Sequence, residues 1–172
     1  MKQLVKESIY AHPIEVVWAA FTNGEALAQW LMPNNFPANA KVGDRFQFRI
    51  DPMGPLGGTV ECEILELEAP TRMVWSWTGC KASGKKMGPQ RVEWQLTARG
   101  ASTHLRLTQS DVGKMPFLMR LMMSFGWGTM VKKWLPRVLE GFEPGSLRYQ
   151  RLEKAPNSGH HKTKTVPGEF YK

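Results

Sequence analysis

The stretch Met73-Val74-Trp75-Ser76-Trp77 places a large apolar side chain at every second position. Alternate side chains of a β-strand point to opposite faces of a sheet, so this stretch predicts a strand with both tryptophans facing a core. The same alternation recurs on either side of it, in residues 45–50, 59–64, 91–96 and 103–108. Together with a sixth segment at residues 4–10, the pattern predicts an antiparallel sheet with one face on a core and one in water.

Three further segments have the period of amphipathic helices. Two are short and follow the first strand, one from Pro13 to Phe21 and one ending at Trp30. The third is the longest, from Trp127 to Phe142, and the sheet needs it as a cover for its apolar face. Pro136 lies inside this helix and lacks the N–H that would bond the carbonyl of Lys132, so we expect a kink there.

The composition favours one globular domain. The chain has 172 residues, a hydrophobic fraction of 42% and a mean hydropathy of −0.37, values that exclude a disordered polymer and a bundle of membrane spans. The first ten residues interrupt every apolar run with Lys or Glu, unlike a secretory signal. Cys62 and Cys80 lack the spacing of a zinc site or a disulfide framework, so we expect free thiols, no metal, no cofactor and a cytoplasmic location.

The net charge of +8 is unevenly distributed. Residues 1–143 hold 17 Lys and Arg against 13 Asp and Glu, whereas residues 144–172 hold 6 against 2. The second segment is also rich in Pro, Gly and Ser and has no sustained apolar period. We therefore expect a domain at 1–143 and a basic, flexible tail at 144–172. No aromatic stacking surface or recognition helix accompanies the basic residues, which argues against a nucleic-acid partner.

The order of these elements, joined to particular residues, resembles the helix-grip fold of the START-like (SRPBCC) superfamily. More narrowly, it is similar to the family named after the C-terminal domain of the activator of Hsp90 ATPase. The matching segments run collinearly through residues 5–142: 11–18, 20–22, 29–31, 42–46, 63–67, 72–77, 102–108 and 126–127. Two positions depart from the family pattern, Pro136 and residues 109–112, where relatives often have a His-x-Gly-like element.

This resemblance implies an α+β fold in which a curved six-stranded antiparallel sheet wraps around a long C-terminal helix, with two short helices after the first strand. It also implies an apolar cavity between sheet and helix, used by relatives for lipids, hormones or polyketides. The partner expected from it is an apolar or aromatic small molecule. We expect no membrane span and a monomer or weak homodimer.

Large side chains from the core faces of the strands and from the long helix are the candidate ligand-binding residues: Phe46, Phe48, Cys62, Trp75, Trp77, Trp94, Leu105, Met123, Trp127, Val131 and Trp134. Two interpretations of the tryptophans stay open. The rings either fill the core themselves, or line a pocket in which an indole N–H orients a polar group of the ligand.

Five of the ten methionines fall between Lys114 and Val131. Methionine adapts to varied partners, so this segment is either a buried loop with a first helical turn or a mobile lid over the cavity.

Catalytic motifs are absent from the sequence: we find no nucleophile elbow, phosphate-binding loop or dinucleotide fingerprint, and we assign no catalytic residue. Ligand binding without catalysis is therefore the first hypothesis. A cyclase or hydrolase is the second, and it requires polar groups that converge in the cavity. Its candidates are Gln109, Asp111, Tyr10 and Ser76. A chaperone-interacting module is the third, and only the family name favours it.

Overall fold

The computed structural model describes residues 3–160 and 163–171. Its strands are β1 (Leu4–Tyr10), β2 (Arg45–Arg49), β3 (Leu56–Glu68), β4 (Arg72–Lys81), β5 (Lys86–Arg99) and β6 (Ser102–Ser110). Its helices are α1 (Ile14–Thr22), α2 (Gly24–Trp30), α3 (Phe117–Thr129) and α4 (Leu135–Leu139), with a π-helical segment, η2 (Met130–Trp134), and two 3-10 turns, η1 (Val112–Lys114) and η3 (Gly168–Tyr171).

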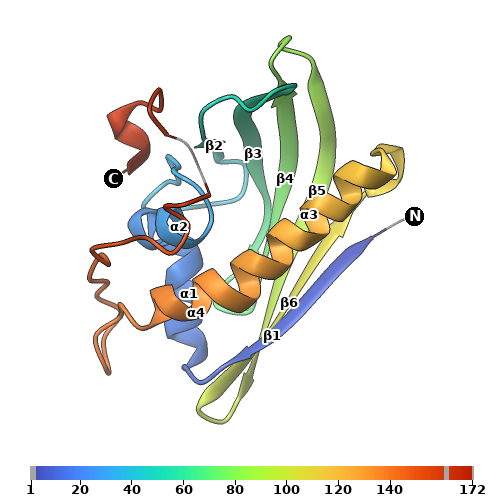
Figure 1. Cartoon of the computed structure of the whole chain (residues 1–172). Helices are drawn as coiled ribbons and strands as arrows, with labels where there is room; N and C mark the ends of the chain where they lie inside the picture. Colours follow the sequence, from blue (N-terminus) through green and yellow to red (C-terminus); the bar gives the residue numbers. More distant parts are fainter. Residues whose placement is uncertain (1–2, 161–162, 172) are drawn as a thin grey trace.

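The six strands form one antiparallel sheet in the order β1-β6-β5-β4-β3-β2. Consecutive strands pair as neighbours from β2 to β6, and β1 returns to pair with β6, with Tyr10 opposite Thr103. The predicted alternation is confirmed: Trp75, Trp94 and Leu105 are buried on one face of the sheet. The sheet curves, and the helices lie across that face (Figure 1).

The long C-terminal helix is continuous from α3 through η2 to α4. Its predicted start at Trp127 was wrong, because α3 begins at Phe117, ten residues earlier. The kink predicted at Pro136 stays a prediction, whereas the helical geometry does change just before it: the wider turns of η2 end at Trp134, and Pro136 is the second residue of α4. The Tyr10 hydroxyl donates to the carbonyl of Val131, 2.7 Å away, and so ties η2 to the end of β1.

Two strands are longer than their alternation predicts. β3 begins at Leu56 and β5 at Lys86, whereas the alternating segments begin at residues 59 and 91. β3 passes through a register shift between Leu56 and Val60, and Gly58 lies within it at φ +73°. A Cβ at Gly58 would lie 2.2 Å from the carbonyl oxygen of Ile50, so only glycine fits at this bulge.

The described part of residues 144–171 lies against α2. Asn157 is buried, and its side chain donates to the carbonyls of Ala28 and Leu31 at the C-terminal end of that helix. Phe170 is also buried, and its carbonyl accepts from the N–H of Asn34. The flexibility predicted for this segment stays a prediction, whereas its described residues make specific contacts with the domain.

Candidate functional site

Nine aromatic rings form one connected cluster between the sheet and the helices, which we call the aromatic interior. Neighbouring ring centroids are 4.7–6.2 Å apart, mostly in tilted or edge-to-face arrangements. The members are Phe21, Trp30, Phe36, Phe46, Phe48, Trp75, Trp77, Trp94 and Trp127.

Trp75 and Trp94 are the centre of the aromatic interior. They project from β4 and β5, and their ring centroids are 5.5 Å apart. Trp94 also contacts Phe21 of α1 at 4.7 Å and Trp127 of α3 at 5.5 Å. Trp75 contacts Phe46 of β2 at 5.3 Å. The strand period sends alternate rings inward, and the apolar stripes of α1, α2 and α3 bring further rings over them.

Several polar groups in this interior have firm partners. The indole Nε1 of Trp127 donates to Oε1 of Gln109 at 2.7 Å, and Gln109 in turn donates to Gln90 at 2.6 Å. The indole Nε1 of Trp30 donates to the carbonyl of Ala20 at 2.9 Å. These bonds satisfy buried donors, and the first of them fixes α3 to the sheet.

Trp75 and Trp94 differ from Trp30 and Trp127 in their hydrogen bonding. Both are completely or almost completely buried, and neither indole N–H has a hydrogen-bond acceptor among residues 3–160 and 163–171. His12 Nδ1, in the turn after β1, is also buried and has no hydrogen-bond partner among these residues. A neighbouring ring face is a weak acceptor and replaces only part of a hydrogen bond, so each unpaired donor costs about 1–3 kcal/mol.

The titratable groups of the interior stay neutral. Burial raises the pKa of the Cys62 thiol well above its usual range, and nearby Glu61 raises it further. Burial likewise raises the pKa of the Tyr10 hydroxyl above its ordinary value, although Ser8 lowers it slightly. A protonated thiol and a protonated phenol are poor nucleophiles, so these groups contribute packing and hydrogen bonds rather than covalent chemistry.

The structure places the predicted ligand-binding residues as follows. Ten of the eleven are buried, and Met123 is partly buried against them. Phe46, Phe48, Trp75, Trp77, Trp94 and Trp127 meet in the aromatic interior. Trp134 is buried farther along the helix, where its ring lies 4.8 Å from that of His160.

The sequence did not mark three members of the aromatic interior as site residues. Phe21 and Trp30 lie on the apolar stripes of the two short helices, and that position was the signal that could have found them. Phe36 lies in the connection between α2 and β2, where no periodicity places a side chain.

The four polar candidates for catalysis do not converge. Gln109 is engaged with Trp127 and Gln90, and Tyr10 with Val131. Ser76 accepts from the N–H of Glu63 at 2.8 Å, on the polar face of the sheet. Asp111 is exposed after β6, in a left-handed conformation at φ 63°.

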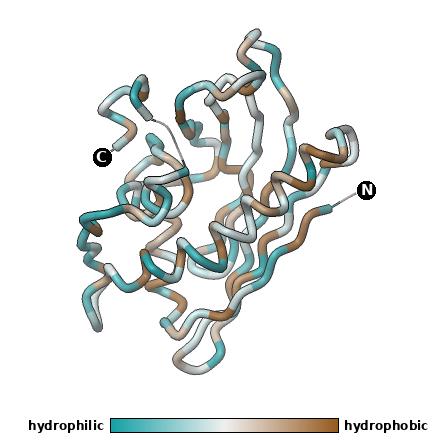
Figure 2. The backbone as a smooth tube through the Cα atoms, viewed as in Figure 1, coloured by the Kyte–Doolittle hydropathy of each residue, from teal (hydrophilic) through white to brown (hydrophobic). Residues whose placement is uncertain are grey.

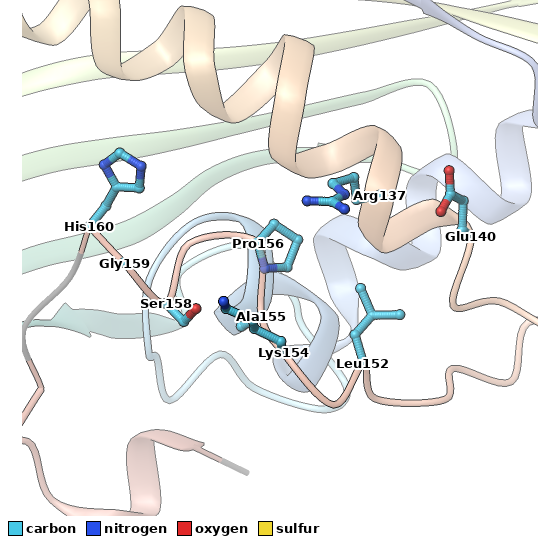
Figure 3. A pocket seen from close by; sticks show the side chains of 9 residues that line it. All are labelled: Arg137, Glu140, Leu152, Lys154, Ala155, Pro156, Ser158, Gly159 and His160. Atoms are coloured by element: carbon cyan, nitrogen blue, oxygen red, sulfur yellow. The ribbon is translucent and has the colours of Figure 1, made fainter.

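Two pockets of about 560 and 550 Å³ lie outside the aromatic interior. The first is formed by the end of the long helix and residues 152–160, and it brings Arg137, Glu140, Lys154 and His160 together (Figure 3). The second is on the polar face of the sheet, where Arg45 pairs with Glu63 at 3.0 Å and Lys86 with Glu61 at 2.6 Å. Both linings are rich in charged groups, unlike the interior.

Comparison with solved structures places the chain among helix-grip proteins. Protein MLL2253 from Mesorhizobium loti is 26% identical, with a TM-score of 0.67 over 81% of this chain and 97% of that one. DynU16, from the dynemicin biosynthetic locus, is 22% identical, with a TM-score of 0.64, and the match covers 87% of this chain but only 50% of DynU16. The Aha1 dimer from Colwellia psychrerythraea is 19% identical, with a TM-score of 0.61 over 76% of this chain and 91% of that one.

No curated protein matches the chain closely enough to count as a relative. Among the described residues, no helix is both long and apolar enough to cross a bilayer. Residues 11–140 match a family described as activator of Hsp90 ATPase homolog 1-like protein, a segment that runs from the turn after β1 to the end of the long helix. The curved sheet, the two short helices and the covering helix are thus those of that family, and the chain belongs to the activator of Hsp90 ATPase homolog 1-like proteins.

Proposed function

We propose that this protein binds an apolar or aromatic small molecule that carries a hydrogen-bond acceptor, in the aromatic interior between the sheet and α3. The observation that carries it is that Trp75 and Trp94, whose rings are neighbours, each have a buried indole N–H without an acceptor among the described residues. A ligand carbonyl or ether oxygen that accepts from either one removes its desolvation cost. No catalytic step is part of this proposal.

Because the rings are packed against one another, ligand binding requires the interior to open. The rings contact one another, so a ligand enters only when they move apart, which requires the helix to shift relative to the sheet. Met123 and Met130 of this helix pack against the interior, and their flexible side chains can repack around a ligand. The origin of DynU16 in a biosynthetic locus also favours a small-molecule role.

The indole N–H resonances test this proposal directly. The seven tryptophans give seven indole ¹H–¹⁵N cross-peaks, which single Trp→Phe variants assign. We would titrate the labelled protein with oleate, progesterone and emodin, which represent an acyl chain, a steroid and a fused aromatic. Binding in the aromatic interior moves the Trp75 or Trp94 peak downfield, as a new hydrogen bond does, and leaves that of partly exposed Trp18 unchanged.

Native mass spectrometry of the protein purified from its own host extends this test beyond the three probes. A co-purifying small molecule supports the proposal. Unchanged indole peaks with every probe, together with a bare protein mass from the host, would contradict it and leave core filling as the role of the rings.

The other two hypotheses have less support. A cyclase or hydrolase requires polar groups that are free to act together on a substrate, whereas the buried candidates Tyr10 and Gln109 are each engaged with partners among the described residues. A chaperone contact is favoured by the family description alone. Stimulation of a chaperone ATPase by the purified chain would establish that contact without bearing on ligand binding.

A further inference from the structure

The first turns of α3 expose large apolar side chains on one face. Phe117 and Phe125 are 72% and 70% exposed, and Leu118, Leu121 and Met122 are exposed as well. We call these five residues the outer apolar face. Their spacing of three, four and seven residues aligns them along one side of the helix, opposite Trp127, which faces the sheet. Figure 2 shows this end of the helix in brown.

The same helix is basic without any acidic residue. Residues 117–139 contain Arg120, Lys132, Lys133 and Arg137, and no Asp or Glu. Lys132, Lys133 and Arg137 are exposed on the half that follows the outer apolar face. The guanidinium of Arg120 lies over the ring of Phe117, 5.9 Å from its centroid. The outward side of the helix thus passes from apolar at Phe117 to cationic at Arg137.

The combination of an apolar half and a cationic half favours some partners for this helix over others. A second copy docked on the same face would place these cations against cations in a parallel pair and against apolar side chains in an antiparallel one. Neither arrangement neutralises them, because residues 117–139 offer no carboxylate and the exposed Glu140 after α4 is a single one against three exposed cations. An anionic lipid surface satisfies both halves at once: its headgroup region accepts phenyl and aliphatic side chains, and its phosphates pair with Lys and Arg. No described helix is long and apolar enough to span a bilayer, which leaves a helix that lies along the surface.

We propose that the outer apolar face of α3 docks on an anionic bilayer surface, with Phe117 and Phe125 inserted among the headgroups and Lys132, Lys133 and Arg137 paired with lipid phosphates. This inference goes beyond the proposed ligand binding and does not depend on it. The residues that carry it are exposed and take no part in the aromatic interior.

Flotation of the full chain with lipid vesicles tests the proposal. We expect binding to vesicles of phosphatidylcholine mixed with phosphatidylglycerol, weaker binding to phosphatidylcholine alone, and partial release at about 0.5 M NaCl, where charge is screened. The double variant Phe117→Ser/Phe125→Ser should bind at least about tenfold more weakly, because it removes the two most exposed rings of the face. Lys132→Gln/Lys133→Gln should lose most of the preference for phosphatidylglycerol.

Leu147→Ser is the matched control, since Leu147 is also an exposed apolar residue but lies in a loop away from α3, and it should bind as the parent does. Circular dichroism melting of each variant checks that the fold is retained. Equal binding by the Phe117→Ser/Phe125→Ser variant and the parent, or no binding to either vesicle, would overturn the proposal. A dimer in analytical ultracentrifugation that this variant converts to a monomer, without vesicle binding by the parent, would assign the face to self-association instead.

Discussion

Two buried tryptophans of this protein differ in whether the indole N–H has a hydrogen-bond acceptor. Trp30 and Trp94 are both buried, and their ring centroids are 5.8 Å apart. Yet the indole N–H of Trp30 reaches the carbonyl of Ala20, whereas that of Trp94 has no acceptor among the described residues. The two side chains therefore make similar apolar contacts and differ in the hydrogen bond.

A pair of phenylalanine substitutions measures that difference. Trp30→Phe removes ring volume and a hydrogen bond, whereas Trp94→Phe removes ring volume and an unpaired donor. We expect Trp30→Phe to reduce the free energy of unfolding by about 1 kcal/mol more than Trp94→Phe. Urea denaturation of both variants gives the comparison, and a larger loss for Trp94→Phe would show that its donor has a partner in solution.

At the scale of elements, regular alternation was the most informative pattern. All six strands were predicted, and in β2 to β6 an inward apolar row alternates with a more polar outward one. β1 departs from this pattern, because its apolar residues Val5 and Ile9 are exposed. The start of α3 was not predicted, because residues 115–123 are apolar on nearly every side and show no helical stripe. Apolar composition normally indicates burial, whereas Phe117 and Leu118 are exposed.

The candidate site was also predictable only in part, because only some of its residues lie in segments with a regular period. Strand period places Trp75, Trp77 and Trp94 on the core face without any knowledge of the tertiary fold. The contribution of Phe36 depends on how the connection after α2 folds back over β2. Which indole N–H finds an acceptor depends on positions set by tertiary packing, such as that of Gln109 opposite Trp127.

Matched glycine substitutions test how rigid the bulge in β3 is. Gly54 and Gly58 both have positive φ, but a Cβ at Gly54 meets nothing within 4 Å, whereas one at Gly58 meets the backbone at Ile50. We expect Gly54→Ala to lower the free energy of unfolding by about 1 kcal/mol through backbone strain alone. Gly58→Ala should lower it further through the clash. Equal losses in thermal or urea unfolding would mean that the bulge relaxes freely.

At the scale of the whole molecule, the segment after residue 143 adds contacts that the family match does not include, since that match ends at residue 140. Besides Asn157 and Phe170, the carboxylate of Asp51 accepts from the backbone N–H groups of Lys164 and Thr165 at 2.8 and 2.7 Å. One carboxylate thus attaches this basic segment to the loop before β3.

Acid should loosen this attachment. The hydroxyl and N–H of Thr165 hold the pKa of Asp51 below its ordinary value of about 4, with smaller contributions from Lys164. A lowered pKa in the folded state means that the attachment is complete above that ordinary value and is lost as the pH falls through the lowered pKa. We expect the amide ¹H shifts of Lys164 and Thr165 to move upfield together in that range.

Asp51→Asn should show the acid-state shifts of both amides already at pH 7. Asp44→Asn is unsuitable as a control, because the carboxylate of Asp44 also accepts a backbone N–H, that of Lys41. Glu153→Gln, an exposed carboxylate within the segment itself, is suitable. Amide shifts at Lys164 and Thr165 that stay constant between pH 7 and pH 2 would contradict the attachment.

The pairing of β1 with β6 has a consequence for synthesis of the protein. A ribosome adds about 5–20 residues per second, and Tyr10 must wait for Thr103 to emerge before the two can pair. During that interval β1 is an unpaired strand with Ile9 and Tyr10 available to other nascent chains. The apolar face of the sheet stays open still longer, until α3 has been made. The topology therefore makes the first strand and the apolar face of the sheet the parts of this chain that wait longest for their partners during synthesis.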